Sequence, residues 1–498
     1  MMHDREKSDG RVVPERLSNN AQGGAAEMVE GRRPAKGNTA SETRPGLSAG
    51  PGAPSDLGRV RRVAATDKEA RFTALLHHVD VDRLRAAYGS VKPKAAPGVD
   101  GVTWADYGLD LEENLRDLHA RVHGGAYRAR PSRRVYIPKP DGRLRPLGIA
   151  ALEDKIVQRA LVEVLNAIYE QDFLGFSYGF RPGRSPHHAL DALAAGIVGK
   201  KVNWVLDADF SDYFSSLDHQ WLMKFLEHRL ADRRVLRLIQ KWLAAGVIED
   251  GSWTAFEEGV PQGASVSPLL ANIYAHYVLD LWAHQWRTRH AHGDVIIVRW
   301  ADDFVVGFEH QEDAEQFWTE LRGRLATFGL ELNAEKTRLI EFGRNAARDR
   351  AARGLGKPDT FQFLGFTHAC GKTRKSGRFK LTRLTDSKRM RAKLLAVKRE
   401  MWKRMHLPIP EQGRWLARVL SGHYNYYAVP DNIEALSAFR EQIIRHWLKS
   451  LRRRSQKHRM DWKRMQRLAD QWLPLPRILH LWSEQRFAAI TQGRSPVR

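Results

Sequence analysis

The sequence predicts an α+β fold, in which a body of mixed strands and helices precedes an almost wholly helical C-terminal region. Residues 295–308, VIIVRWADDFVVGF, hold two β-branched apolar runs around an Ala-Asp-Asp turn, which predicts a β-hairpin. Residues 204–209, WVLDAD, predict a second strand that ends in a carboxylate. Beyond Ser387 the apolar residues recur at helical spacing.

The remaining elements follow from composition and periodicity. Residues 1–65 are rich in Gly, Pro, Ser, Ala and Arg, so we expect a disordered tail, with packed structure beginning near Thr66. A hairpin is expected over 135–149, around the turn Pro140-Asp141-Gly142. Strands are expected over 361–384, with turns at Gly371 and Gly377. Helices are expected at 75–88, 111–123, 153–169, 186–197, 219–231 and 235–245.

Composition excludes several classes of protein. No run of about 18 apolar residues occurs, so we expect no membrane span. The N-terminal residues lack the apolar core of a secretory signal. The single cysteine, Cys370, rules out disulfides and cysteine-rich zinc modules, and a buried free thiol is a more ordinary role for it than a reactive one. A reducing, cytoplasmic location fits.

The positive charge is concentrated in the C-terminal region. Residues 371–498 hold 31 Lys and Arg against 9 Asp and Glu, a net +22 of the chain's +23. Such a surface binds polyanions by counterion release. Aromatic residues lie among these basic ones, which suits unpaired RNA bases, although for each tryptophan alone a helix core is the more ordinary role.

Carboxylates end two of the predicted strands. Asp302 and Asp303 repel one another in the hairpin turn, unless a divalent cation with its preference for hard oxygen ligands lies there. Alone, this pair is equally compatible with a polar turn. With Asp209 on a neighbouring strand it predicts a two-metal site for phosphoryl transfer. Between them, the Gly/Pro turn 259–263, GVPQG, suggests close approach of the backbone to a ligand.

Seven motifs together resemble one family. They occur in the order RVYIPKPDGRLRPLGI, GFRPGRS, LDADFSDYF, GVPQGASVSPLLANIY, WADDF, LNAEKT and FQFLGF, and they resemble the reverse transcriptases of group II intron-encoded proteins. The resemblance extends from about Phe72 to the C-terminus. It implies a right-hand polymerase, whose fingers and palm contain an antiparallel sheet with the catalytic Asp residues, followed by a helical thumb and maturase region.

The resemblance also divides the chain. We expect a tail over 1–65, fingers and palm over 66–370, connecting strands over 371–386, a thumb and maturase domain over 387–465 and a basic nucleic-acid-binding segment over 466–498. The stretch HYNYYAVPDN, residues 423–432, resembles the maturase-specific region. Many relatives continue into an HNH endonuclease with cysteine pairs, and none is expected here.

The family motifs assign Asp209, Asp302 and Asp303 as catalytic ligands of two Mg²⁺ ions, with Mn²⁺ as a substitute. In the family an aromatic residue follows the first carboxylate by five positions, as Phe214 follows Asp209. The competing frame begins at Asp207, which has no aromatic residue at that spacing. We expect Asp207 to cap a strand end instead.

The nucleotide-binding residues are also assigned by resemblance. Lys139 and Arg145 match positions that hold the triphosphate. Phe214 matches the aromatic that packs under the incoming sugar and rejects a 2′-hydroxyl. The remaining three assignments are Gln262 and Gly263, which should line the nucleotide and template pocket, and Lys336, which resembles the lysine near the leaving pyrophosphate but is also compatible with an ordinary surface lysine.

Trp300 departs from the family pattern, which has Tyr immediately before Ala-Asp-Asp. Tryptophan keeps a flat apolar face, but it is larger and donates a hydrogen bond only through its ring N–H. The departure leaves open a splicing-only maturase with an impaired polymerase site. Two further hypotheses are a retron-like reverse transcriptase and a basic protein that binds RNA through its positive surface alone.

The expected function is RNA-directed DNA polymerisation coupled to maturase activity. The implied partners are the group II intron RNA, a DNA target and primer, and dNTPs, with no membrane. The implied location is the bacterial cytoplasm, at the nucleoid when the protein is bound to target DNA.

Overall fold

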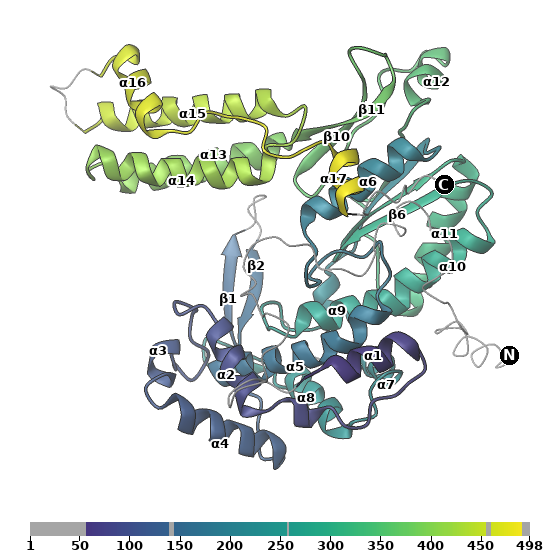
Figure 1. Ribbon diagram of the computed structural model, residues 1–498, viewed down its shortest axis with the longest axis vertical. Coiled ribbons are helices and arrows are strands. Elements are labelled where there is room, and N and C mark those ends of the chain that lie inside the picture. The colour runs from purple at the N-terminus through teal and green to yellow at the C-terminus, as the bar shows by residue number, and fades with distance from the viewer. Residues whose placement is uncertain (1–55, 139–143, 256–257, 455–459, 491–498) are drawn as a thin grey trace.

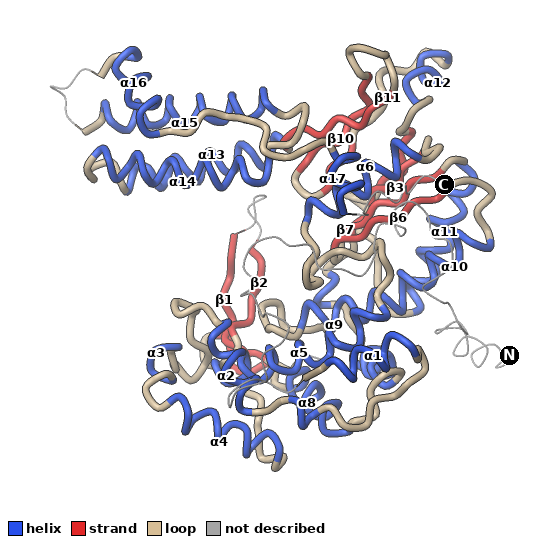
Figure 2. The backbone as a smooth tube through the Cα atoms, viewed as in Figure 1, coloured by secondary structure: helices blue, strands red, loops and turns tan. Residues whose placement is uncertain are grey.

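The computed structural model describes residues 56–138, 144–255, 258–454 and 460–490. Helices and antiparallel sheets are mixed in a large body, and a separate group of helices extends from it as an arm (Figure 1). Figure 2 shows that the strands lie in the body and at the base of the arm, whereas the arm itself is helical. The predicted α+β class is confirmed.

Strands form three sheets. The first has the order β2-β1-β4-β5, the second β11-β10-β9 and the third β6-β7-β3-β8. All pairings are antiparallel except a short parallel one between β1 and β4. The strands are β1 Ser132–Pro138, β2 Leu144–Ile149, β3 Trp204–Asp209, β4 Val247–Glu249, β5 Ser252–Thr254, β6 Val295–Trp300, β7 Asp303–Phe308, β8 Arg338–Glu341, β9 Phe361–Phe363, β10 Phe366–Lys372 and β11 Phe379–Thr385.

Helices surround the third sheet and build the arm. A π-helical turn, His276–Asp280, joins α9 to α10 without a break. The helices are α1 Gly58–Thr66, α2 Val81–Ser90, α3 Trp104–Tyr107, α4 Leu111–His123, α5 Leu152–Asp172, α6 Pro186–Gly199, α7 His219–Glu227, α8 Arg233–Ala244, α9 Ser267–Ala275, α10 Leu281–Arg289, α11 Gln311–Thr327, α12 Ala346–Ala352, α13 Ser387–Lys403, α14 Ile409–Tyr427, α15 Ile433–Arg452, α16 Trp462–Trp472 and α17 Ser483–Ile490.

In the described ranges, the body and the arm each have their own hydrophobic core. One core runs through the body, and a second is formed by α13 to α16. The expected boundary after residue 465 is wrong, because it falls inside α16, whose Met465 and Ala469 both belong to the second core. The boundary after residue 370 falls inside β10, which continues to Lys372.

Other expectations also need correction. Packed structure begins before Thr66, because α1 buries Val60 and Ala64 against the body; of the expected tail, residues 1–55 lie outside the described ranges. Gly371 lies within β10, and the turn before that strand is formed by Gly365 at φ +82°. The turn at Gly377 and the hairpin of β1 and β2 are confirmed, although residues 139–143 lie outside the description.

The expected helix over 75–88 is divided, because a 3-10 turn at 76–78 precedes α2. Within the described residues, no helix has the length and apolar content that a bilayer span requires.

Candidate active site

The three predicted catalytic carboxylates lie at the same end of two neighbouring strands of the third sheet. Asp209, the last residue of β3, is the register partner of Asp303, the first residue of β7. The Phe210 backbone N–H donates to the Asp302 carbonyl oxygen at 3.3 Å. Segments 93 positions apart in sequence therefore place their acidic residues side by side.

A strained turn presents the Asp pair. Ala301 adopts φ +58°, an unusual conformation for a residue with a Cβ. The loop that precedes α6 supports this turn, because a Cβ on Gly179 would overlap the Ala301 backbone nitrogen. The GFRPGRS motif thus packs directly against the turn.

The buried Arg299 side chain stabilises the Ala301 turn through hydrogen bonds. Its side chain is 0% exposed and forms a two-pronged ion pair with Asp280 at 2.7 and 2.6 Å. It also donates to the Ala301 carbonyl oxygen at 3.0 Å and to Asn272 Oδ1 at 3.1 Å. The Asn272 amide in turn donates to the Gly179 carbonyl at 2.7 Å. The buried pair therefore connects the turn to α9 and to the GFRPGRS loop.

This network was not predicted from the sequence. Its members come from separate segments, and only the charge inside the apolar run VIIVRW was a local signal. An arginine in a buried strand needs a partner, because an unpaired charge there is costly. The π-helical turn that carries Asp280 is a second unusual feature at the same place.

The carboxylates form a cluster of like charges. Burial, followed by the charge of Asp209, raises the pKa of Asp302. Burial raises the pKa of Asp303 well above its usual value, and the charges of Asp207, Asp209 and Asp302 add to the effect. Such a cluster attracts cations.

Lys336 supplies one positive charge. Its ammonium group forms an ion pair with Asp209. Its charge and that of Arg145 partly offset the rise in the pKa of Asp302. The prediction that Lys336 lies in the site agrees with this contact. Arg389, at the start of α13, acts on Asp303 in the same direction and was not predicted.

Asp207 lies inside β3 and does not cap a strand end, so that expectation is wrong. It pairs in register with Val305 and Arg338. Its carboxylate is 3.4 Å from the Arg338 guanidinium, and burial raises its pKa to about 6. It therefore lies on the same side of β3 as Asp209, two residues away.

The carboxylate oxygens near Asp209 are the candidate donors to a metal ion. In the described ranges, no three acidic, histidine or cysteine side chains are drawn close enough together to hold an ion as they stand. Lys336 is ion-paired with one carboxylate oxygen of Asp209. Carboxylate oxygens with excess negative charge are the ligands that suit Mg²⁺. The residues therefore fit the ion in kind.

The GVPQG turn lies between the first hairpin and Phe214. The Gly148 N–H donates to the Gln262 carbonyl at 2.7 Å, and a Cβ on Gly263, at φ +113°, would approach the Gly148 oxygen to 2.7 Å. The Val260 N–H donates to the Phe214 carbonyl at 2.7 Å. Gln262 lines an open hollow with residues of the hairpin and of the Phe214 segment. Among the predicted nucleotide-binding residues, Gln262, Gly263 and Phe214 are thus brought together.

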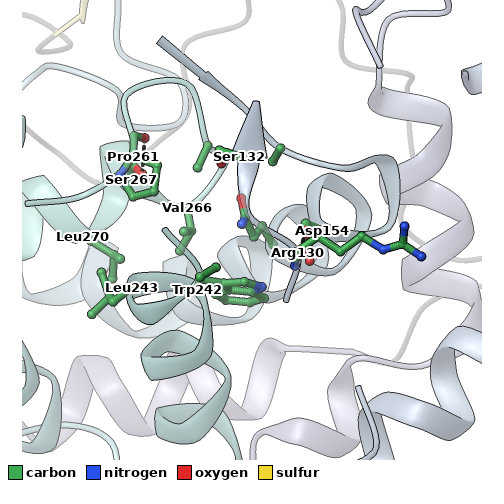
Figure 3. Close-up of a pocket in the computed structure, with 13 residues that line it drawn as sticks. Arg130, Ser132, Asp154, Trp242, Leu243, Pro261, Val266, Ser267 and Leu270 are labelled. Carbon is green, nitrogen blue, oxygen red and sulfur yellow. Dashed lines mark hydrogen bonds between the residues drawn. The ribbon is translucent and has the colours of Figure 1, made fainter. Parts of the chain in front are cut away.

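Figure 3 shows a second cavity, behind this turn. Asp154 lies near Arg130 at one side, and Pro261 and Ser267 lie at the other. The Ser267 hydroxyl donates to the Pro261 carbonyl at 2.9 Å. None of the three catalytic carboxylates lines this cavity.

Arg145 and Lys139 are the residues predicted to hold the triphosphate. Arg145, on β2, is exposed and close enough to influence Asp302. Lys139 lies outside the described residues. Trp300 is the register partner of Asp303 and packs partly buried against the body core.

Comparison with known proteins identifies the family. Residues 137–368 match the family model described as "Reverse transcriptase (RNA-dependent DNA polymerase)". Protein YkfC of Escherichia coli K12 is 38% identical over 337 residues, which cover 58% of this chain and 87% of YkfC. Group II intron-encoded protein LtrA of Lactococcus lactis subsp. cremoris is 37% identical over 175 residues, 34% of this chain and 29% of LtrA.

The chain belongs to the group II intron reverse transcriptase/maturase family. Its enzymatic class is RNA-directed DNA polymerase. The putative COX1/OXI3 intron 1 protein of Saccharomyces cerevisiae is 28% identical over 56% of this chain and 38% of its own length. The chain spans 29% of LtrA and 38% of the yeast protein. What those longer proteins do as a whole is therefore only proposed for this chain.

Proposed function

We propose that Asp209, Asp302 and Asp303 hold two Mg²⁺ ions for RNA-templated DNA synthesis, with Mn²⁺ as a substitute. The observation that carries the proposal is the pairing of Asp209 with Asp303 across adjacent strands, beside Asp302 in the strained turn. When bound, the ions activate the primer 3′-hydroxyl and neutralise the transferring phosphate. The carboxylates position these ions, and Arg299 keeps the turn in place beneath them.

The nucleotide pocket is proposed to lie between the carboxylates and the first hairpin. Arg145 and Lys139 hold the triphosphate, because positive charge must offset the phosphates during transfer. Phe214 packs under the sugar, and the turn at Gln262 and Gly263 lines the template side. Lys336 moves from Asp209 to the leaving pyrophosphate when metal enters. Its ion pair with Asp209 supports this exchange of one cation for another.

The parts of a right-hand polymerase follow from the same assignment. We propose that the β1–β2 sheet and its helices are the fingers, and that the β6-β7-β3-β8 sheet is the palm. The core of α13 to α16 then forms the thumb, together with the maturase surface. The expected C-terminal segment after residue 465 is divided between α16, which is part of the thumb core, and α17, which returns to α6.

The proposed nucleic-acid partners are group II intron RNA, a DNA primer and a DNA target. Residues 371–498 carry +22 of the chain's net charge, which supports binding of a polyanion through this region. Binding of the host intron assists its folding for splicing, and the polymerase then copies it into DNA during retrohoming. A splicing-only function is not favoured, since all three carboxylates lie together.

Primer extension tests the polymerase proposal. The assay uses an annealed RNA template, a DNA primer, dNTPs and Mg²⁺. We expect extension by the wild type and none by Asp302→Ala/Asp303→Ala. Asp349→Ala changes a partly exposed carboxylate on α12, which is paired with the neighbouring Arg348, and should extend normally. Equal extension by the double variant and the wild type would exclude these residues as the metal site, and a wild type that binds RNA without extending would favour the splicing-only protein.

A further inference from the structure

Phe180 is a conformational outlier. Its φ is +59°, in the left-handed region that bulky side chains avoid, and its side chain is 55% exposed. Strained backbone together with an exposed aromatic ring is unfavourable for stability. Such outliers persist where the surrounding structure imposes them, and they cluster at ligand sites.

The surrounding structure does impose this conformation. On one side, the Gly179 carbonyl accepts from Asn272, and the Tyr178 N–H donates to the Arg299 carbonyl at 2.9 Å. On the other side, the Arg181 guanidinium is buried and donates to the Leu174 and Ser177 carbonyls at 2.8 and 2.6 Å. Phe180 is therefore held outward by rigid neighbours.

The ring lies beside the proposed sugar pocket. It meets Phe214 edge to face, with ring centroids 6.4 Å apart. The residue immediately before it, Gly179, touches the Ala301 turn that presents Asp302. Phe180 is thus placed between the sugar-contacting aromatic and the metal turn, with over half of its side chain open to solvent.

We propose that Phe180 contacts the incoming nucleotide and forms, with Phe214, one continuous aromatic wall beside its sugar. The proposal rests on the polymerase function above and adds a specificity-determining residue to it. An aromatic face contributes binding free energy without reading the base. Because the Phe180 ring packs edge to face on Phe214, it extends that wall and leaves less room for a 2′-hydroxyl than Phe214 alone.

The test distinguishes the contribution of the Phe180 ring from that of its backbone conformation. Phe180→Asn removes the ring, while asparagine tolerates the left-handed conformation. Phe180→Tyr keeps the ring. Leu109→Asn removes an 81% exposed apolar side chain in the loop between α3 and α4, as a matched control. Single-nucleotide extension then gives KM and kcat for a dNTP and for the matching rNTP, and the Kd for primer–template is measured separately.

We expect Phe180→Asn to raise KM for the dNTP about tenfold, the size of a lost nucleotide–aromatic contact, with a smaller change in kcat. Discrimination against the rNTP should fall, whereas Phe180→Tyr and Leu109→Asn should behave as the wild type. The thermal midpoint of Phe180→Asn should not fall.

Unchanged KM and discrimination in Phe180→Asn would overturn the proposal, as would a loss explained wholly by weaker primer–template binding or by a lower thermal midpoint. Absence of extension by the wild type is a different result, because it contradicts the polymerase function on which the proposal rests.

Discussion

Arg299 stabilises the geometry of the Ala301-Asp302-Asp303 turn. It is fully buried and binds Asp280, Asn272 and the Ala301 carbonyl, so it joins the turn to the continuous helix of α9 and the π-helical turn. A buried ion pair contributes little net stability, but removal of one partner leaves an uncompensated charge. Positioning of the turn and stability of the body should therefore be lost together.

Arg299→Met is expected to lower the free energy of unfolding by about 3–5 kcal/mol, because buried Asp280 loses both charge-assisted hydrogen bonds from the guanidinium. Arg299→Met/Asp280→Leu should recover part of this loss without restoring extension, since the hydrogen bond to Ala301 stays absent. Denaturant unfolding and primer extension measure the two effects. Arg322→Met, at an exposed position on α11, is the control. A single variant as stable as the control would contradict the role assigned to the pair.

His368 should make stability depend on pH. It is fully buried in β10, stacks on Phe361 with centroids 4.7 Å apart, and burial lowers its pKa from 6.5 to about 3. Between these values the unfolded chain binds more protons than the folded one, so stability falls as pH drops through 6.5. His368→Phe should therefore lose less thermal stability than the wild type between pH 7 and pH 5. An identical pH dependence in both proteins would show that this histidine does not contribute.

Single residues were predictable where a motif is local. The carboxylates, Phe214 and the glutamine turn all lie in short, recognisable strings. Asp207 was misassigned, because the sequence alone does not show that Arg338 of β8 lies opposite it. Partners such as Asp280 lie in other segments, so no local pattern identifies them.

At the scale of elements, an ion pair joins the C-terminal helix α17 to α6. Asp191 of α6 is 1% exposed and accepts from Arg486 at 2.6 Å and from Arg383 of β11 at 3.3 Å. Arg383 also donates to Ser483 Oγ at 2.6 Å. Figure 1 shows α17 lying against α6. This contact ties the end of the described chain to the body after the arm.

Asp191→Asn is expected to release α17, because two guanidinium groups lose their shared counter-charge. The opening free energy of the helix should fall by about 2–3 kcal/mol. Hydrogen exchange of the α17 amides measures it, and Glu434→Gln, in the first turn of α15, serves as the control. Unchanged protection of α17 would mean that its apolar contacts alone hold it.

Strong helices were predicted well and their packing was not. The expected helix over 111–123 has the bounds of α4, and that over 186–197 differs from α6 only at its end. These segments have clear 3.6-residue periodicity. The return of α17 to α6 depends on contacts almost 300 positions apart in sequence, which periodicity does not contain.

At the scale of the whole molecule, charge and chemistry are divided between arm and body. The body holds the acidic site, while α13 to α16 carry most of the excess positive charge on a separate core. Arg391 and Arg399 of α13 are both exposed. The arm is therefore the part of the described chain along which we expect a polyanion to bind.

Affinity for structured RNA should fall steeply with salt. Each phosphate contact adds about −0.9 to the slope of log affinity against log salt for duplex, and about −0.7 for single strands. Arg391→Glu/Arg399→Glu should weaken binding and make the slope shallower by about 1–2. Arg322→Glu, on the near-neutral body, should leave both unchanged. A salt-independent affinity would contradict the electrostatic role of the arm.

Counting bound Mn²⁺ is the most direct test of whether the ends of β3 and β7 form the metal site of a polymerase. The measurement is electron paramagnetic resonance on a complex with primer–RNA template and a non-hydrolysable dNTP. We expect about two tightly bound ions in the wild type and fewer in Asp209→Asn and Asp302→Asn, with Asp349→Ala as wild type. Equal numbers of tightly bound ions in the wild type and in both Asn variants would contradict the assignment.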